Sequence, residues 1–485
     1  MFKIIRNIVL VLLTAAGVGQ AAAQSADERI ATAMNNADWF GLNDIYNSTP
    51  QDSINPFLEV FSRCLIGNRL NRPDVSVPAF RELLSSHSES LGLPNLLSSA
   101  YMYARDLSRT ADNTAAASIL RSVADAVRPH VDAAVDAQLL NMAQLYEALS
   151  EYKPYSVSIA GGAEGSIPFS FREVGNKSKG GILMYLDSTT VNGFPADIVF
   201  DTGAGMNIIS DSLAQAYGLT ILDADASISG VGKANGKYAI AHKLSMGNVT
   251  VGDVPFIVAD ISTNNAEADK HINALEIIVG SDLMLALKDI TVDFIARHIA
   301  IQADTSARSD DSPNMCFSST ENLITTGKIA GQPMTMCIDT GAGGYGWLSA
   351  DYFEKNKAFI TDNCSPDTVR HAGIGGVSIQ QCYNMHDATM SLSGANVTIP
   401  EIAIFTESLP ALAYEAVVGL KSLMLYRAIR FNLVDMKLTT VPYPDATTAT
   451  RPMPKFEYSP APKPNTLQII GHVLLEAARE HARWH

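Results

Sequence analysis

The hydrophobic and polar positions follow a helical spacing through the first third of the chain. From about Ala26 to Ser150, apolar residues recur three and four positions apart, as in NTAAASILRSVADAV and QLLNMAQLYEAL. This spacing places them on one face of a helix. The breaks NRPD, LGLPN and SRTADN divide the region, because proline, glycine and clustered polar residues interrupt helices. We therefore expect an α-helical domain of about six or seven helices over residues 24–152.

The pattern changes to β-structure after Tyr152. Apolar runs become short and alternate with polar residues, glycine is more frequent, and turn residues recur about every ten positions, which is typical of a series of β-strands. The stretch AGGAEGS, a little after Glu151, has the composition of a linker, so the helical and β parts should fold separately. The sequence thus predicts a multidomain chain in which an all-α N-terminal domain precedes an all-β region.

The β region contains an internal duplication. Three blocks recur in the same order about 140 positions later, and such self-similarity indicates a repeated structural unit. We expect two copies of one β lobe, at residues 165–304 and 312–442. The matched blocks are VNGFPADIVFDTGAG (191–205) with IAGQPMTMCIDTGAG (329–343), SGVGKANGKYAIAHKLSMGNVTV (229–251) with AGIGGVSIQQCYNMHDATMSLSGANVTI (372–399), and IIVGSDLMLALKDITVDFIARHIAIQ (277–302) with AVVGLKSLMLYRAIRFNLVDMKLTTV (416–441).

Both ends of the chain have a different character. Residues 1–23 contain Lys3 and Arg6, then an apolar run too short to span a bilayer, and end in three alanines, which is the pattern of a secretory signal peptide. Residues 443–465 form a proline-rich linker, and residues 466–485 an amphipathic helix that we expect to dock on another domain of the chain. From the signal peptide we expect an exported protein, periplasmic or secreted, with no integral membrane segment after signal removal.

Composition limits the class of partner. The chain has 485 residues, 47% of them apolar, so it can bury several cores. Its formal net charge of -15 becomes -17 without the two basic residues of the signal peptide, and such a chain is repelled by phosphate backbones. We therefore expect no nucleic-acid partner. The five cysteines are too few for a disulfide framework.

The most informative motif is the pentapeptide DTGAG, which stands at the same place in both copies. It occurs in FDTGAG, with Asp201, and in IDTGAG, with Asp339. A single Asp-Thr-Gly is usually a turn, because these are turn-forming residue types. Two of them in matched contexts favour chemistry instead, since two carboxylates brought face to face make an acid/base pair.

The motif and its surroundings resemble the retropepsin-like and pepsin-like aspartic proteases. In each copy an apolar strand delivers the aspartate at a sharp glycine turn, and a second apolar strand ends in a glycine, Gly280 or Gly419. Members of this family carry Asp-Thr-Gly-Ala near the start of each lobe and an aliphatic-aliphatic-Gly segment near its end. The resemblance covers residues 165–442 and implies a bilobal acid-protease domain of the retropepsin-like kind.

The resemblance also implies a catalytic pair. Asp201 and Asp339 would meet across a pseudo-twofold axis and share one proton, because both cannot easily ionise at close range. One acts as base toward a water molecule and the other donates its proton to the scissile carbonyl oxygen. Gly203 and Gly341 would let the backbone approach these carboxylates and donate N–H groups to them.

Other family positions support this pair. The hydroxyl groups of Thr202 and Thr340 are implied to hydrogen-bond across to the opposite lobe, and Gly280 and Gly419 match the site where a strand passes beside the aspartate loop. Two Gly-aliphatic-Gly segments match the hairpin that closes over substrate as a flap, although such a segment alone is only a turn. The flap candidates are Gly230, Val231, Gly232, Gly373, Ile374 and Gly375.

Two positions depart from the pepsin pattern. Ala204 and Ala342 stand where pepsin-like enzymes usually carry serine or threonine. A hydroxyl group there would donate to the carboxylate and favour its charged form, which alanine cannot do. The pair should therefore titrate at higher pH than the pair of pepsin, and we expect a mildly acidic optimum.

The positions of the cysteines predict one disulfide bond. Cys364 and Cys382 flank the second flap candidate, so an exported protein could join them in a disulfide at the base of that hairpin, although other pairings are open. Cys337 stands two residues before Asp339, but its counterpart in the first copy is Val199, which favours a buried small hydrophobe over thiol chemistry.

The sequence therefore predicts an exported aspartic endopeptidase, a monomer that hydrolyses polypeptide substrates without a metal or an organic cofactor. The alternative is a peptide-binding or adaptor protein on an acid-protease scaffold, with the helical domain recruiting a protein partner. Intact Asp-Thr-Gly in both copies argues against that alternative. Whether the helical domain recruits a partner or covers the site as an inhibitory segment stays open.

Overall fold

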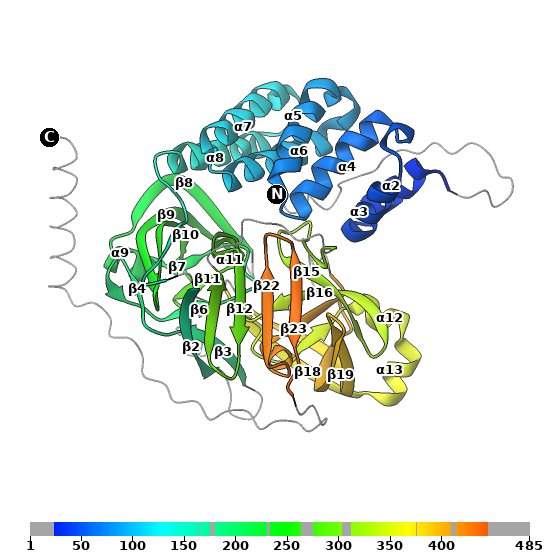
Figure 1. The fold of residues 1–485 in the computed structure, drawn as a ribbon, viewed down its shortest axis with the longest axis vertical. Helices are drawn as coiled ribbons and strands as arrows, with labels where there is room; N and C mark the ends of the chain where they lie inside the picture. The colour runs from blue at the N-terminus through cyan, green and yellow to red at the C-terminus, as the bar shows by residue number, and fades with distance from the viewer. Residues whose placement is uncertain are drawn as a thin grey trace. The chain divides into compact units, whose positions relative to one another are not determined.

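The computed structural model describes residues 24–162, 164–174, 180–229, 233–262, 275–302, 312–374, 376–408 and 414–444. These residues form two units: a helical unit made of residues 24–151 and 312–321, and a β unit made of the rest (Figure 1). The predicted order of an α-helical region followed by a β-rich region is confirmed. The predicted signal peptide and almost all of the segment after residue 442 lie outside the described residues.

The helical unit is a series of helices in which neighbours along the chain pack against each other. Several of their starts carry side-chain caps: Ser25 and Glu28 form a capping box, and Asp112 accepts from the N–H of Ala115. The break LGLPN lies inside one helix, where Gly92 has a φ of 64° and interrupts the helical geometry. The elements are α2 (Ala26–Asn35), α3 (Trp39–Ser48), η1 (Gln51–Ser53), α4 (Pro56–Arg69), α5 (Pro73–Ser86), α6 (Ser88–Arg109), α7 (Asn113–Val127), η2 (Arg128–His130) and α8 (Ala133–Leu149).

A segment from much later in the chain completes the helical unit. It includes β14 (Met315–Phe317), which contacts α4 and whose three side chains are fully buried. Arg109 lies over the ring of Phe317, and Arg69 donates to the carbonyl of Ser318. The helices are therefore not a self-contained N-terminal domain, because part of their core comes from the chain that joins the two halves of the β unit.

The first sheet of the β unit has the order β23-β22-β12-β13-β2-β3-β6-β11-β7-β10-β9-β4-β5, with β1 paired to β10 and β8 to β9. Its centre is β6, β11 and β7, whose residues are all buried and, except for Ser210, all apolar. The strands that come from the first half of the β unit are β1 (Ser156–Ile159), β2 (Glu164–Val174), β3 (Gly181–Leu186), β4 (Thr189–Val191), β5 (Phe194–Pro195), β6 (Ile198–Phe200), β7 (Ile208–Ser210), β8 (Thr220–Ser229), β9 (Lys233–Met246), β10 (Val249–Ala259), β11 (Ile277–Val279), β12 (Asp289–Asp293) and β13 (His298–Gln302). This half also contains helices α9 (Asp211–Ala216) and α11 (Ser281–Leu287).

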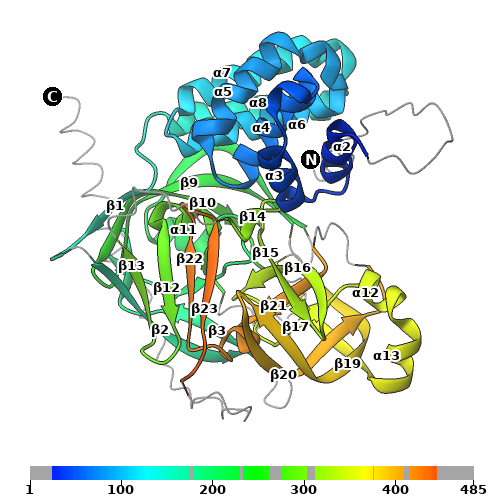
Figure 2. The ribbon, with the colours of Figure 1, turned by 45° about the vertical axis from the view of Figure 1, so that its right-hand side comes forward.

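The second sheet repeats the pairing pattern at the centre of the first. It runs β15-β16-β21-β17-β20-β19-β18, and β15 also pairs with β19 (Figure 2). In it β21 lies between β16 and β17, parallel to one and antiparallel to the other, just as β11 lies between β6 and β7. The elements are β15 (Leu323–Ile329), β16 (Gln332–Asp339), β17 (Gly346–Leu348), α12 (Ala350–Lys355), α13 (Lys357–Asn363), β18 (Ser365–Gly373), β19 (Gly376–Leu392), β20 (Ala395–Phe405), β21 (Ala416–Gly419) and α14 (Leu420–Leu423).

The last two strands, β22 (Ala428–Asn432) and β23 (Lys437–Val441), leave the second sheet and join the first. β22 pairs antiparallel with β12, and the guanidinium of Arg430 donates two hydrogen bonds to the buried carboxylate of Asp289 there. The end of the second half of the β unit is thus hydrogen-bonded to the first half. Among the described residues, no helix combines the length and the apolar character that crossing a membrane requires.

A close approach of two helices in the helical unit gives a first prediction. A Cβ atom added at Gly67 would lie 2.6 Å from the backbone nitrogen of Ser76. Gly→Ala inside a helix otherwise stabilises by about 1 kcal/mol, whereas overpacking costs about 1–3 kcal/mol. We expect Gly67→Ala to lower the midpoint of thermal unfolding followed by helical circular dichroism. Gly162→Ala, where the added atom meets nothing within 4 Å, is the control; a stabilised Gly67→Ala protein would contradict the described packing.

Candidate functional site

The structure brings the two aspartates of the repeated motif together. Asp201 follows β6 directly and Asp339 is the last residue of β16, so each stands where a buried strand ends. A Cβ atom added at Gly203 would lie 2.5 Å from Cγ of Asp339, and one added at Gly341 would lie 2.4 Å from Cγ of Asp201. Each carboxylate therefore packs against the glycine of the opposite motif, a place that only glycine can occupy.

Backbone N–H groups hold the carboxylates. Oδ1 of Asp201 accepts from the N–H of Gly203 at 2.9 Å and from that of Ala204 at 3.2 Å. Oδ1 of Asp339 accepts from the N–H of Ala342 at 2.9 Å. These donors favour the charged form of a carboxylate.

The two threonines link the loops reciprocally. The N–H of Thr202 donates to Oγ1 of Thr340 at 3.0 Å, and the N–H of Thr340 donates to Oγ1 of Thr202 at 3.1 Å. Each hydroxyl in turn donates to a carbonyl of the opposite strand, Thr202 to Ile338 at 2.6 Å and Thr340 to Phe200 at 2.7 Å. Both side chains are 1% exposed, so these four bonds are shielded from water and fix the separation of the two aspartates.

The strands β11 and β21 pass beside the aspartate loops at glycine residues. A Cβ atom at Gly280 would lie 2.4 Å from the carbonyl oxygen of Ala204, and one at Gly419 would lie 2.7 Å from that of Ala342. Both glycines stand at such a passage, as the family resemblance implies. Asn207, whose Oδ1 accepts from the N–H of Gly280 at 3.0 Å, was not predicted, because it stands outside the repeated pentapeptide.

Burial and mutual repulsion keep a proton on the pair. Burial raises the pKa of Asp201, against the effect of its backbone donors. Burial, followed by the charge of Asp201, raises the pKa of Asp339 to about 8. Two carboxylates in contact share one proton when neither can be solvated. The site can therefore offer a carboxylate and a carboxylic acid side by side near neutral pH.

The hairpins proposed as flaps are only partly described. Gly230, Val231, Gly232 and Gly375 lie outside the described residues, whereas Gly373 ends β18 and pairs with Gly376 of β19. The side chain of Ile374, at the tip of that second-sheet hairpin, is 8% exposed and packs into an apolar cluster of the first half of the β unit.

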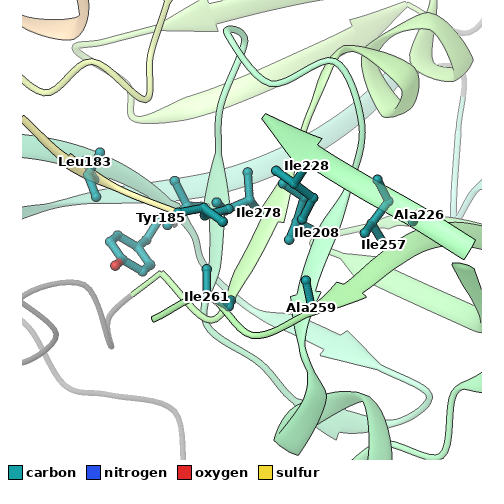
Figure 3. Packing of buried hydrophobic residues seen from close by; sticks show 11 residues of the cluster. Leu183, Tyr185, Ile208, Ala226, Ile228, Ile257, Ala259, Ile261 and Ile278 are labelled. Carbon is teal, nitrogen blue, oxygen red and sulfur yellow. The ribbon is translucent and has the colours of Figure 1, made fainter. Parts of the chain in front are cut away.

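Figure 3 shows this cluster, which includes Ile208 and Ile278 of the central strands and Ala226 and Ile228 of β8. Ala204 and Met206, just after Asp201, pack against it. Both candidate hairpins therefore contribute to one apolar cluster beside the Asp201 loop.

The predicted Cys364–Cys382 disulfide is wrong for this structure, in which all five cysteines are free. In the β18–β19 ladder Cys382 pairs with Asp367, which is three residues beyond Cys364. Three strand residues span about 10 Å, whereas disulfide-linked Cα atoms lie about 4–7 Å apart. Cys337 is buried, which raises the pKa of its thiol well above the usual range, as for a small hydrophobe. Among the described residues, no His, Cys, Asp and Glu side chains group in a way that could hold a metal ion.

The buried pair should make the protein less stable as pH rises. Each aspartate has a pKa near 4 in the unfolded chain, whereas the folded pair holds its proton to higher pH. The stabilisation that this proton gives is fully present below about pH 4. It is lost as pH rises through the folded pKa, by about 1.4 kcal/mol per pH unit for each proton. As pH rises from about 4.5 to about 7.5, the free energy of unfolding of Asp339→Asn, measured in urea, should gain about 2–4 kcal/mol relative to that of wild type. Asp362→Asn, on the exposed face of α13, is the control; parallel curves for all three proteins would contradict the shared proton.

Comparison with known proteins agrees with this geometry for the first half of the β unit. A search of curated proteins found no match. Residues 188–283 match the model of a family described as Aspartyl protease. The matched segment contains Asp201, Thr202 and Gly203 of the first motif and Gly280, which passes beside its loop. These residues therefore carry the sequence pattern of an aspartyl protease family.

Proposed function

We propose that the protein is an exported aspartic endopeptidase in which Asp201 and Asp339 hydrolyse peptide bonds. One observation carries the proposal: two Asp-Thr-Gly loops 138 residues apart are joined by four buried threonine hydrogen bonds that hold two carboxylates in contact. A turn has no need of that arrangement, whereas acid/base catalysis needs both protonation states within reach of one substrate.

The chemistry follows from the shared proton. The ionised carboxylate takes a proton from a water molecule as the water oxygen bonds to the scissile carbonyl carbon, and the protonated carboxyl gives its proton to the carbonyl oxygen. The tetrahedral intermediate then collapses: the carboxyl that took the proton of the water gives it to the leaving nitrogen as the C–N bond breaks. The other carboxylate takes a proton from a hydroxyl group of the intermediate, so that the pair again holds one proton. The water is the nucleophile and the substrate a polypeptide, so the cycle needs no oxidant or cofactor.

We also propose that the two halves of the β unit are copies of one lobe. The matched sequence blocks and the repeated strand pairing around β11 and β21 support this. The first lobe corresponds to residues 165–304; the second begins near residue 322 rather than 312, since residues 312–321 belong to the helical unit. Export rests on the signal-peptide pattern of residues 1–23.

The dyad proposal is tested by removing one carboxylate at a time. Asp201→Asn and Asp339→Asn should each lower the rate of peptide cleavage by about 10²–10⁴-fold or more, because one carboxyl group cannot be both acid and base. The measurement is mass-spectrometric mapping of cleavages in a peptide mixture incubated with residues 24–485 from about pH 3 to pH 7. Asp362→Asn should cleave like wild type; a wild-type protein that cleaves nothing, or a single variant that retains its turnover, would refute the proposal.

Ala204 and Ala342, beside the two aspartates, give a prediction about the pH-rate profile. A serine at position 204 or 342 would add a donor beside N–H groups that already reach the carboxylates. Because a donor favours the ionised form, its pKa falls, and the acidic limb of the pH-rate profile should move down by about one unit in Ala204→Ser or Ala342→Ser. Ala204→Gly and Ala342→Gly, which add no hydroxyl, should not show this downward shift. If the acidic limb of the folded serine variants stays in place or moves to higher pH, the assignment of Asp201 and Asp339 as the catalytic pair is contradicted.

A further inference from the structure

The side chain of Asn322 acts on the Asp201 loop from outside the repeated motif. Its Nδ2 donates to the carbonyl oxygen of Gly203 at 2.9 Å. That carbonyl belongs to the same peptide group as the N–H of Ala204, which donates to Oδ1 of Asp201. In a planar trans peptide the C=O and the N–H point in opposite directions. The amide of Asn322 therefore holds the plane of a peptide whose other edge points at the carboxylate.

The position equivalent to Asn322 in the first half of the β unit carries a side chain of different chemistry. Tyr185 pairs with Val199 in the first sheet and Ile324 pairs with Cys337 in the second, and Val199 and Cys337 are equivalent in the repeated blocks. Two residues before each partner stand Leu183 and Asn322. Leu183 is buried in the apolar cluster and has no side-chain donor, so the two halves of the β unit differ at this position.

The chain leading to Asn322 is firmly held. The preceding residue, Glu321, belongs to the helical unit. Its carboxylate forms an ion pair with Arg105 at 2.7 Å and accepts hydrogen bonds from Arg69 and Arg109 at 3.3 Å. These three arginines come from α4 and α6, and all four side chains are largely buried, where ion pairs are little screened by salt. Glu321, the residue before Asn322, is thus firmly held within the helical unit.

We propose that Asn322 is a positioning residue that makes the two carboxylates unequal. By orienting the 203–204 peptide it directs the N–H of Ala204 at Asp201, so that Asp201 is the ionised base and Asp339 carries the shared proton. The kinetic consequence rests on the proposed peptidase function, whereas the distribution of the proton does not. The inference can therefore be tested with and without a substrate.

The first experiment needs no substrate. The stability of the full chain is measured against pH for Asp339→Asn, in which only Asp201 of the pair titrates, and for Asp201→Asn, in which only Asp339 does, each with and without Asn322→Leu. Loss of the amide should raise the midpoint of the stability change by about 0.5–1 pH unit in the Asp339→Asn background, since the carboxylate loses a well-aimed donor. In the Asp201→Asn background it should move the midpoint by less than about 0.2 unit.

Equal shifts in both backgrounds, or none in either, would overturn the proposal. Asn322→Leu keeps the size of the side chain and removes the donor, and Asn322→Ala serves the same comparison if the leucine variant does not fold. Asn322→Gln, which keeps an amide, should recover at least part of the shift. A purely structural role for Asn322 predicts lower stability at every pH with an unchanged midpoint, and that result also counts against the proposal.

The second experiment uses peptide hydrolysis. In Asn322→Leu we expect kcat to fall about tenfold with KM unchanged, and the acidic limb to move to higher pH by the shift seen in the stability measurement. If wild type cleaves no peptide, the proposed function fails and the stability experiment alone decides the role of Asn322. If wild type cleaves and the limb of Asn322→Leu stays in place, the positioning role fails while the dyad stands.

Discussion

The reciprocal hydrogen bonds between Thr202 and Thr340 are the constraint on which the rest of the site depends. Each threonine accepts from the backbone of the opposite loop and donates to the opposite strand. The bonds hold two loops from distant parts of the sequence at one separation, and that separation leaves room only for glycine opposite each carboxylate. Two buried acids in contact cannot both be charged. The shared proton is thus a consequence of how the loops are joined.

The surroundings make this symmetric arrangement unequal. Asp201 accepts from two N–H groups of its own loop, and Asn322 supports one of them from the far side of the peptide. Ile374 brings a hairpin of the second sheet into the apolar cluster of the first half. A duplicated scaffold can bring two acids together, while residues that are not duplicated decide which of them holds the proton.

Much of the arrangement follows from local sequence. The parts that could not be predicted depend on contacts between distant segments of the chain. The order of helices and strands follows from hydrophobic periodicity, and the meeting of Asp201 and Asp339 follows from a motif that recurs in matched contexts. Asn322 lies outside those blocks, so no repeat marks it, and its contact depends on the three-dimensional path of the chain. The disulfide prediction failed because sequence proximity to a hairpin does not specify strand register, which separates Cys364 from Cys382. The burial of β14 in the helical unit was equally hidden, since a short apolar run does not say which core it joins.

The titration of the two carboxyl groups themselves tests most directly whether Asp201 and Asp339 share a proton. Protein labelled with ¹³C at the aspartate carboxyl carbons can be followed by NMR across pH, with the two resonances assigned by their loss in Asp201→Asn and Asp339→Asn. A shared proton predicts that the two resonances titrate as a coupled pair, which keeps its proton well above the usual aspartate range, with Asp201 carrying most of the charge. If both groups titrate independently near pH 4, like exposed aspartates, the carboxylates do not share a proton.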